Sequence, residues 1–191
     1  MKEYLARLLH DGLLLKSDPE LPSVATLVAG GPVRGSWWAH PASHAIFMAT
    51  EELAARPDVV IVKLVSGKDT FVQERLWPEL LAVATAHERW QFAGLTKSAE
   101  ALHKLAVGEG EVPASGADAR LLESRLLVRA EPFHTEAGHH EKRLECWEHW
   151  AQRIGFADRA LPPVAASKAA FERIYPTAKW LWRSRRGRSS A

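Results

Sequence analysis

The residue types best suited to chemistry gather in one run, SWWAHPASH, at residues 36–44. Trp37 and Trp38 are adjacent, His40 follows, and His44 lies one turn into a predicted helix. Indole rings stack on nucleobases and a helix N-terminus attracts phosphate, so this run indicates either a ligand pocket or a nucleic-acid-binding edge. The alternative is that both tryptophans fill an interface between two parts of the chain.

Basic residues form a second group of candidates. The stretch at residues 179–188 contains no acidic residue and interleaves its basic side chains with Trp180 and Trp182. Such a segment is typical of an arm that binds phosphates, although a solvated tail has the same composition. The residues expected to bind nucleic acid are Arg34, Lys63, Lys68, Arg75, Arg183, Arg185, Arg186 and Arg188.

No sequence motif indicates catalysis or a bound cofactor. The single cysteine and the scattered serines form no nucleophile motif, and GKD at residues 67–69 lacks the Ser or Thr that follows the lysine of a phosphate-binding loop. The histidines and the cysteine between residues 134 and 149 fit no standard zinc spacing. We therefore expect no catalytic residue, no metal and no cofactor.

The composition is that of an ordinary soluble globular protein, with 47% hydrophobic and 25% charged residues. A net charge of +2 is too small to attract nucleic acid to the protein as a whole. Binding of nucleic acid would therefore require basic residues gathered on one face. One cysteine excludes an internal disulfide and fits a reducing cytoplasm. Charged residues interrupt the apolar N-terminal segment, which argues against a signal peptide, and no run reaches membrane-spanning length.

Periodicity predicts three helices in the first third of the chain. The first covers about residues 2–16, the second is SVATLVA with Ser23 as its cap, and the third runs from Pro41 to about residue 55. The buried face of the third helix is expected to comprise Ala45, Ile46, Met48, Ala49 and Leu53, which leaves Glu51 and Glu52 outside, where they would repel phosphate.

A β-branched run at residues 59–65 predicts the first strand of a hairpin that returns over residues 70–76. A three-residue loop, Gly67-Lys68-Asp69, would pair Val60 with Leu76 on a core face and place Lys63 on a wetter face. A second hairpin candidate spans about residues 125–147. There, pairing of His134 with Gly138 would set Leu126 opposite Cys146 and Val128 opposite Leu144, and Pro132 confines its strand to an edge.

The two halves of the chain share one predicted order. Each has two helices, a Gly-x-Val-x-x-Ser loop (residues 31–36 and 110–115), a further helix, a hairpin and then a tryptophan, Trp77 or Trp147. Three helices followed by a two-stranded ribbon are typical of the winged helix. We therefore predict a mainly α (α+β) protein of two tandem winged helix-turn-helix units, residues 1–77 and 78–155, with a C-terminal helix and basic tail at 156–191.

Three blocks of the sequence carry a family resemblance: GSWWAHP at 35–41, VVIVKLVSGKDTFVQERLWPELLAV at 59–83 and ASGADARLLESRLLV at 114–128. The chain resembles small bacterial proteins related to the AlkZ/YcaQ DNA glycosylases over most of residues 20–155. The resemblance implies tandem winged helices and a link to DNA. The catalytic Gln-x-Gln or Gln-x-Asp pair of that family is missing, because Gln73, Gln91 and Gln152 stand in no such motif.

These observations favour a DNA-binding protein in repair or regulation that does not act as a glycosylase. Two alternatives remain open at the level of the sequence. One is an enzyme or small-ligand binder with a pocket around Trp37, Trp38, His40 and His44. The other is a protein-interaction scaffold, because a winged-helix fold does not by itself define a function.

Overall fold

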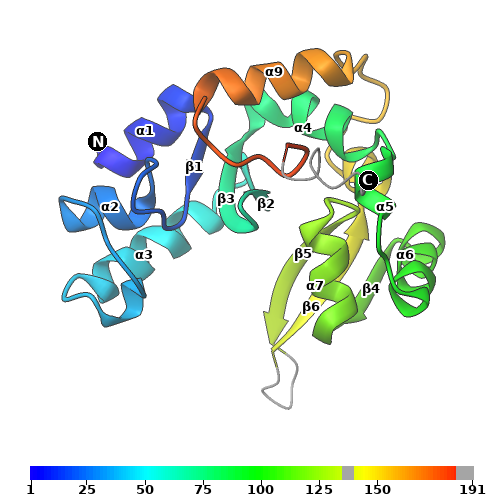
Figure 1. Ribbon diagram of the computed structural model, residues 1–191, viewed down its shortest axis with the longest axis horizontal. Helices are drawn as coiled ribbons and strands as arrows, with labels where there is room; N and C mark the ends of the chain where they lie inside the picture. Colours follow the sequence, from blue (N-terminus) through cyan, green and yellow to red (C-terminus); the bar gives the residue numbers. More distant parts are fainter. Residues whose placement is uncertain (135–139, 184–191) are drawn as a thin grey trace, which may run out of the picture. The chain divides into compact units, whose positions relative to one another are not determined.

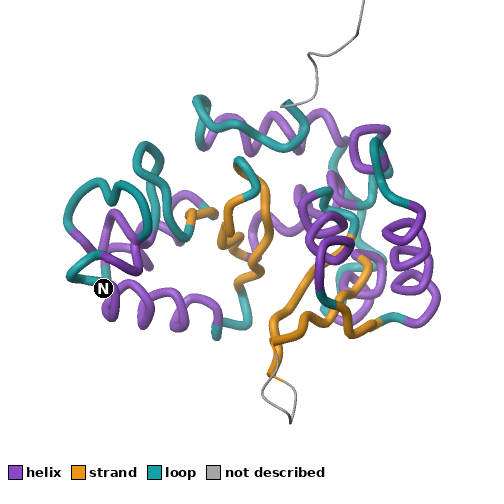
Figure 2. The backbone as a smooth tube through the Cα atoms, turned by 60° about the horizontal axis from the view of Figure 1, so that its bottom comes forward, coloured by secondary structure: helices purple, strands orange, loops and turns teal. Residues whose placement is uncertain are grey.

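A computed structural model describes residues 1–134 and 140–183. The fold is mixed α+β, with two small three-stranded sheets. The chain divides into two compact units, which Figures 1 and 2 allow the reader to follow. Unit 1 comprises Met1–Trp77 and Ala169–Arg183, and unit 2 comprises Pro78–Lys168. The region 156–191, expected as one C-terminal segment, therefore contributes residues to both units.

Unit 1 contains an antiparallel sheet with the strand order β1-β3-β2. Its core includes the fully buried side chains of Leu8, Leu14, Val24, Leu53 and Phe71. The elements are α1 (Glu3–Asp11), β1 (Leu13–Leu15), α2 (Val24–Ala29), the 3-10 helix η1 (Trp37–Ala39), α3 (Ser43–Ala54), β2 (Val59–Val65), β3 (Lys68–Gln73) and the 3-10 helix η2 (Glu74–Leu76).

The first helix is shorter than its periodicity predicts, and the strand β1 replaces its last turn. Helix α1 ends at Asp11 because Gly12 adopts a left-handed conformation with φ 81°. A Cβ atom at Gly12 would lie 2.6 Å from the Nε atom of Arg75, so the close approach also requires glycine. The three leucines of β1 are all fully buried, and a short apolar run of this kind fits a helix and a buried strand equally well.

The second helix is confirmed, with Ser23 accepting a hydrogen bond from the Thr26 N–H. Helix α3 is also present, but its buried face differs from the predicted one. Ala45 and Met48 are exposed, and Thr50 is buried instead. The Thr50 hydroxyl donates to the Ile46 carbonyl oxygen at 2.8 Å, which satisfies its polar group inside the core.

The predicted register of the first hairpin is wrong. Val60 faces Val72 rather than Leu76, because the loop is the two-residue turn Ser66-Gly67 and the register shifts by one residue between Lys63 and Val65. Both loop residues have positive φ, 52° and 70°, which is the geometry of a tight hairpin turn that suits the twist of the strands. Lys68 consequently opens β3 instead of standing at the tip of the loop.

The faces of this hairpin also differ from the prediction. The face expected to be wetter carries Ile61 and Phe71, which pack in the cluster formed with α1, α2 and α3. The opposite face, with Val60 and Leu64, is buried as well. Arg75 lies beyond the end of β3, in η2.

Residues 179–183, which we call the C-terminal strap, pair with the C-terminal end of β2 at its outer edge. The strap follows α9 (Val164–Ile174) and carries the red end of the colour scale in Figure 1. The Ser66 N–H donates to the Lys179 carbonyl oxygen at 2.9 Å, and the Leu181 N–H donates to the Leu64 carbonyl oxygen at 3.1 Å. Trp180 forms a bridge with Val65 and is fully buried, so the strap extends the sheet of unit 1.

Unit 2 has an antiparallel sheet with the strand order β4-β6-β5. Pro132 lies on the edge strand β5, as predicted. Thr96 caps α6, and the segment that follows α6 contains the strand β4. The elements are α4 (Trp77–Ala84), α5 (Arg89–Phe92), α6 (Lys97–Glu109), β4 (Glu111–Ala114), α7 (Gly116–Ser124), β5 (Val128–His134), β6 (His140–Cys146) and α8 (Trp147–Arg153).

The second hairpin is shifted by two residues from its predicted register. Val128 faces Cys146, and His134 pairs with His140 rather than with Gly138, which lies outside the described residues. An even shift keeps each side chain on its face, so Cys146 is buried as expected.

The predicted alignment of the two halves is wrong, although the units do share a strand order. Residues 31–36 form an irregular loop after α2, whereas residues 110–115 contain β4. By sheet order, β4 corresponds to β1, since each is the first strand and pairs with the last one. Two α-helices, α2 and α3, separate the first two strands of unit 1, but only α7 separates those of unit 2.

Candidate functional site

An exposed aromatic surface lies where η1 leads into α3. Trp37 is buried in a cluster with Ala25, Val33 and Ile46, so it anchors η1 to the body of unit 1. Trp38 stacks on Trp37 with 4.0 Å between ring centroids and 25° between ring planes. The Trp38 residue is nevertheless 62% exposed. One tryptophan therefore holds the other in place at the surface.

Further exposed side chains continue this surface along α3. The Phe47 ring lies 5.9 Å from the Trp38 ring and is partly exposed, and Met48 beside it is 53% exposed. His44 is exposed on the first turn of α3. We call the exposed residues Trp38, His44, Phe47 and Met48 the Trp38 surface.

The four residues expected to line a pocket do not act together. The His40 Nδ1 atom accepts a hydrogen bond from the Ala42 N–H at 3.1 Å, which stabilises the turn that leads into α3. Trp37 belongs to the core, while Trp38 and His44 face outward. This arrangement presents a surface rather than an enclosure.

Among the five described basic residues that were expected to bind phosphate, three have acidic partners. The Lys63 Nζ atom lies 2.6 Å from the Asp69 Oδ1 atom, and the Lys68 Nζ atom lies 2.6 Å from the Asp18 Oδ2 atom. Arg183 pairs with Glu172. These ion pairs lower the charge that the hairpin and the strap can offer to phosphate.

Two more of these basic residues lie on exposed positions. The Arg75 guanidinium donates to the His10 carbonyl oxygen and remains exposed in η2. Arg34 is exposed in the loop that precedes η1. The expected contacts at Arg185, Arg186 and Arg188 lie outside the described residues.

The tryptophans of the strap cannot stack on nucleobases. Trp180 is fully buried and Trp182 is 8% exposed, and their rings stack on each other at 5.2 Å. The Trp182 Nε1–H donates to the Glu172 Oε1 atom at 2.8 Å. Residues 179–183 thus form part of the folded unit, whereas the sequence suggested either an arm that binds phosphates or a solvated tail.

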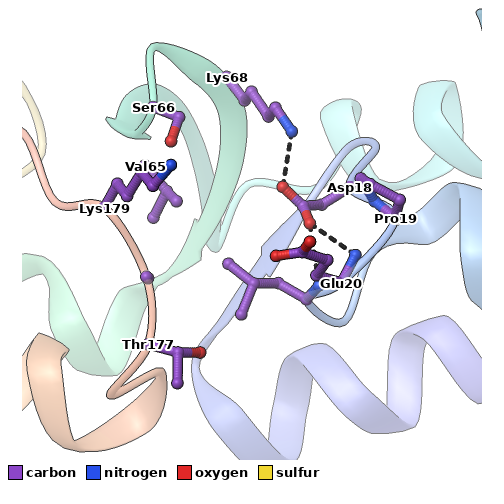
Figure 3. Close-up of a pocket in the computed structure, with 10 residues that line it drawn as sticks. Asp18, Pro19, Glu20, Val65, Ser66, Lys68, Thr177 and Lys179 are labelled. Carbon is purple, nitrogen blue, oxygen red and sulfur yellow. Dashed lines mark hydrogen bonds and ion pairs between the residues drawn. The ribbon is translucent and has the colours of Figure 1, made fainter. Parts of the chain in front are cut away.

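A small polar pocket, which the sequence did not indicate, lies beside the first hairpin. Figure 3 shows it lined by Asp18, Glu20, Ser66, Lys68, Thr177 and Lys179, with Lys68 pointing at Asp18. Its volume is about 230 Å³. Asp18 precedes a proline and reads in the sequence only as a helix breaker, although Asx turns are common at such positions.

Asp18 is the most strongly held carboxylate of this pocket. Its Oδ1 atom accepts hydrogen bonds from the N–H groups of Glu20 and Leu21, both at 2.9 Å. Burial alone would raise the pKa of Asp18, but the hydrogen bonds from Lys68 and from these backbone groups outweigh burial and lower the pKa. The carboxylate therefore stays ionised and holds the end of the hairpin to the loop after β1.

Other candidate chemical groups serve the fold. The Gln73 side chain donates to the Asp58 Oδ2 atom at 3.3 Å and accepts from the Arg75 N–H at 3.1 Å. Burial raises the pKa of the Cys146 thiol, which disfavours the reactive thiolate. Within residues 1–134 and 140–183, no three His, Cys, Asp or Glu residues group as metal ligands would. None of the described helices has the length and apolar character needed to cross a membrane.

Comparison with known proteins gave no match, whether to a protein-family model, to a curated protein or to a solved structure.

Proposed function

We propose that the protein binds DNA without catalysing a reaction, and that unit 1 is a winged helix whose third helix, α3, makes the contact. The observation that carries this proposal is the order helix, strand, helix, helix, strand, strand with the sheet order β1-β3-β2. In helix-turn-helix proteins the recognition helix enters the major groove, and α3 holds the corresponding position here. The resemblance of residues 20–155 to the AlkZ/YcaQ group supports the same proposal.

The charges of unit 1 favour contacts near the start of α3 over contacts at the hairpin. Lys63 and Lys68 are engaged by Asp69 and Asp18, so they contribute little net positive charge. Arg34 is exposed in the loop before η1, and the N-terminal end of α3 carries the positive end of the helix dipole. We therefore move the proposed phosphate contacts from the hairpin to Arg34 and the first turn of α3.

We propose that unit 2 is a winged helix with one helix fewer between its first two strands than unit 1 has. Its order is α6, β4, α7, β5, β6, and its sheet order β4-β6-β5 matches that of unit 1. Helix α7 would occupy the place of the recognition helix, with Arg120 exposed on it. Lys142 of β6 pairs with Glu123, so this unit offers less positive charge than its arginines suggest.

Fluorescence anisotropy of the full chain with labelled duplex, branched and damaged DNA at low salt tests the proposal. Arg34→Ala should weaken binding about fivefold with every DNA, because a phosphate contact is independent of sequence. Arg173→Ala is the matched control, since Arg173 is also an exposed arginine of unit 1, on α9. If the full chain binds none of these DNAs, the proposed function is wrong.

A protein-interaction role is the second candidate, and the apolar character of the Trp38 surface favours it. Exposed Trp, Phe and Met side chains are enriched at protein interfaces. Glu51→Lys separates the two roles. If the protein binds DNA, the new positive charge on α3 should strengthen binding several-fold. If it binds a protein through the apolar Trp38 surface, the substitution should not strengthen binding. If the chain forms a stoichiometric complex with a protein and has no affinity for DNA, the protein-interaction role is correct.

A further inference from the structure

We propose that Trp38 is a stacking platform for an unpaired base, so that the DNA preferred by this protein is single-stranded or contains an unstacked nucleotide. This inference rests on the proposed function and names its substrate class. It follows from the geometry of the two tryptophans, from the groups around them and from the shape of duplex DNA.

The Trp38 ring is held in place before any ligand arrives. Trp37 is buried, and Trp38 lies nearly parallel to it at a stacking distance of 4.0 Å. The Lys16 ammonium lies over the Trp37 ring, 5.8 Å from its centroid. A ring that is already fixed loses little conformational entropy on binding, which favours affinity.

An exposed indole face suits an unpaired base better than a base pair. A duplex presents only the edges of its bases in the grooves, and each base face is covered by its neighbours. A single-stranded or flipped base exposes its face, and proteins that bind such bases stack them on aromatic side chains. Trp38 is the most exposed tryptophan among the described residues, at 62%.

The neighbours of Trp38 fit the rest of a nucleotide. Phe47, 5.9 Å away, offers a second apolar contact for an adjacent base or sugar. Arg34 and His44 are exposed on the segments that flank η1, where the phosphates on either side of a stacked base require positive charge. Glu51 is exposed one turn beyond Phe47 and would repel phosphate, which restricts the path of the strand to the η1 side of α3.

Three DNA probes of equal length test this inference on the full chain: an oligothymidine strand, a perfect duplex and the same duplex with one central bulged base. We expect the single strand and the bulged duplex to bind at least fivefold more tightly than the perfect duplex. Trp38→Ala should weaken binding of the first two about tenfold, which is typical for loss of one stacked base, and should change duplex binding less than twofold. Trp38→Phe should restore most of the loss.

Leu9→Ala is the matched control, because Leu9 is an exposed apolar residue of unit 1 that lies outside the Trp38 surface and offers no flat ring. Thermal unfolding of each variant shows whether it is folded, and the preference of the unmodified chain for unpaired DNA tests the inference without any variant. Equal binding of all three probes, or equal weakening of all three by Trp38→Ala, overturns the stacking platform and leaves the DNA-binding proposal standing. Failure to bind any probe overturns both.

Discussion

At the scale of single residues, Asp18 shows how one carboxylate can join distant parts of unit 1. Its side chain is only 10% exposed, and it binds Lys68, which lies fifty residues further along the chain. Because the loop after β1 and the first residue of β3 meet at this ion pair, Asp18 contributes to the stability of unit 1 as well as to the pocket of Figure 3.

The first prediction concerns the pH dependence of this contribution. The folded-state pKa of Asp18 is below its ordinary value of 3.8, so the stabilisation is complete above that value and is lost as the pH falls through the folded-state pKa. Asp18→Asn should lower the free energy of unfolding at pH 7 by about 1–3 kcal/mol, the usual cost of breaking a charged hydrogen-bonded pair. Urea unfolding at several pH values measures both effects.

In the same experiment, the loss of stability between pH 4 and pH 2 should be smaller for Asp18→Asn than for the unmodified chain. Glu51→Gln is the control, because Glu51 is exposed. A pH profile of Asp18→Asn that runs parallel to that of the unmodified chain would contradict the role given to this carboxylate.

The sequence indicated the importance of Trp37 and Trp38 but could not show which ring is buried. That difference depends on which side of η1 faces Val33 and Ile46, a tertiary contact with no sequence period. The ion pairs of Lys63 and Lys68 could not be read from the sequence for a related reason. Their partners Asp69 and Asp18 come close only when the hairpin takes its observed register and the loop after β1 folds back.

At the scale of elements, glycine decides where α1 gives way to β1. Gly12 has φ 81°, and a Cβ atom there would meet both Arg75 and Leu76 at less than 3.0 Å. Gly30 ends α2 with a similar φ of 74° but has no atom within 4 Å of the position of a Cβ. Comparing substitutions at these two glycines therefore distinguishes the free-energy cost of a left-handed backbone from the cost of steric crowding.

The second prediction compares alanine at these two positions. Gly30→Ala should destabilise the protein by about 1 kcal/mol through its left-handed backbone alone. Gly12→Ala should cost about 2 kcal/mol or more, because Arg75 must also leave the His10 carbonyl oxygen. Thermal and urea unfolding measure the loss of stability in each variant. Equal losses would mean that Arg75 and Leu76 move away from the new Cβ atom of Gly12→Ala at no cost in stability.

The third prediction concerns the C-terminal strap. Trp180 is fully buried and packs beside Phe171 at 5.8 Å, so Trp180→Ala should reduce the free energy of unfolding of unit 1 by about 3–5 kcal/mol. Trp38→Ala is the control and should cost less than about 0.5 kcal/mol, because its ring is mostly exposed. Similar losses for the two variants, measured by urea unfolding, would refute the placement of the strap in the core.

Element types were largely predictable from the sequence, and strand registers were not. The first hairpin was found because its first strand is a β-branched run, and the second because a hairpin there places apolar residues such as Val128 and Cys146 on one face. The first register depended on Ser66, a non-glycine residue with positive φ, which the turn pattern did not suggest. Strand β1 was missed because Leu13–Leu15 is too short for its period to be recognised.

At the scale of the whole molecule, charge limits the strength of any contact with DNA. Unit 1 holds nearly equal numbers of basic and acidic residues, and many of them are paired with each other. We assign phosphate contacts to Arg34 and keep the prediction from the sequence that Arg185, Arg186 and Arg188 make such contacts too. The assignment can be tested by counting the ions released on binding.

The fourth prediction is therefore a salt dependence. The slope of log K against log salt concentration should be about −4 for the full chain, at roughly −0.9 for each of four phosphate contacts with duplex DNA. Deletion of residues 184–191 should reduce it to about −1. Anisotropy titrations between 50 and 200 mM salt, roughly the range in which such slopes are measured, provide the test. An unchanged slope after the deletion would exclude phosphate contacts by these arginines.

Unit 1 draws on two stretches of chain, Met1–Trp77 and Ala169–Arg183, with the continuous unit 2 between them. During translation the outer edge of β2 must wait for the strap while the ribosome adds the intervening residues, a delay of roughly 5 to 20 seconds. Unit 2 can therefore fold before unit 1 is complete, although most of unit 1 is synthesised first. An unpaired strand edge is a site of mispairing with other nascent chains, so unit 1 is exposed to such mispairing until the strap has been made.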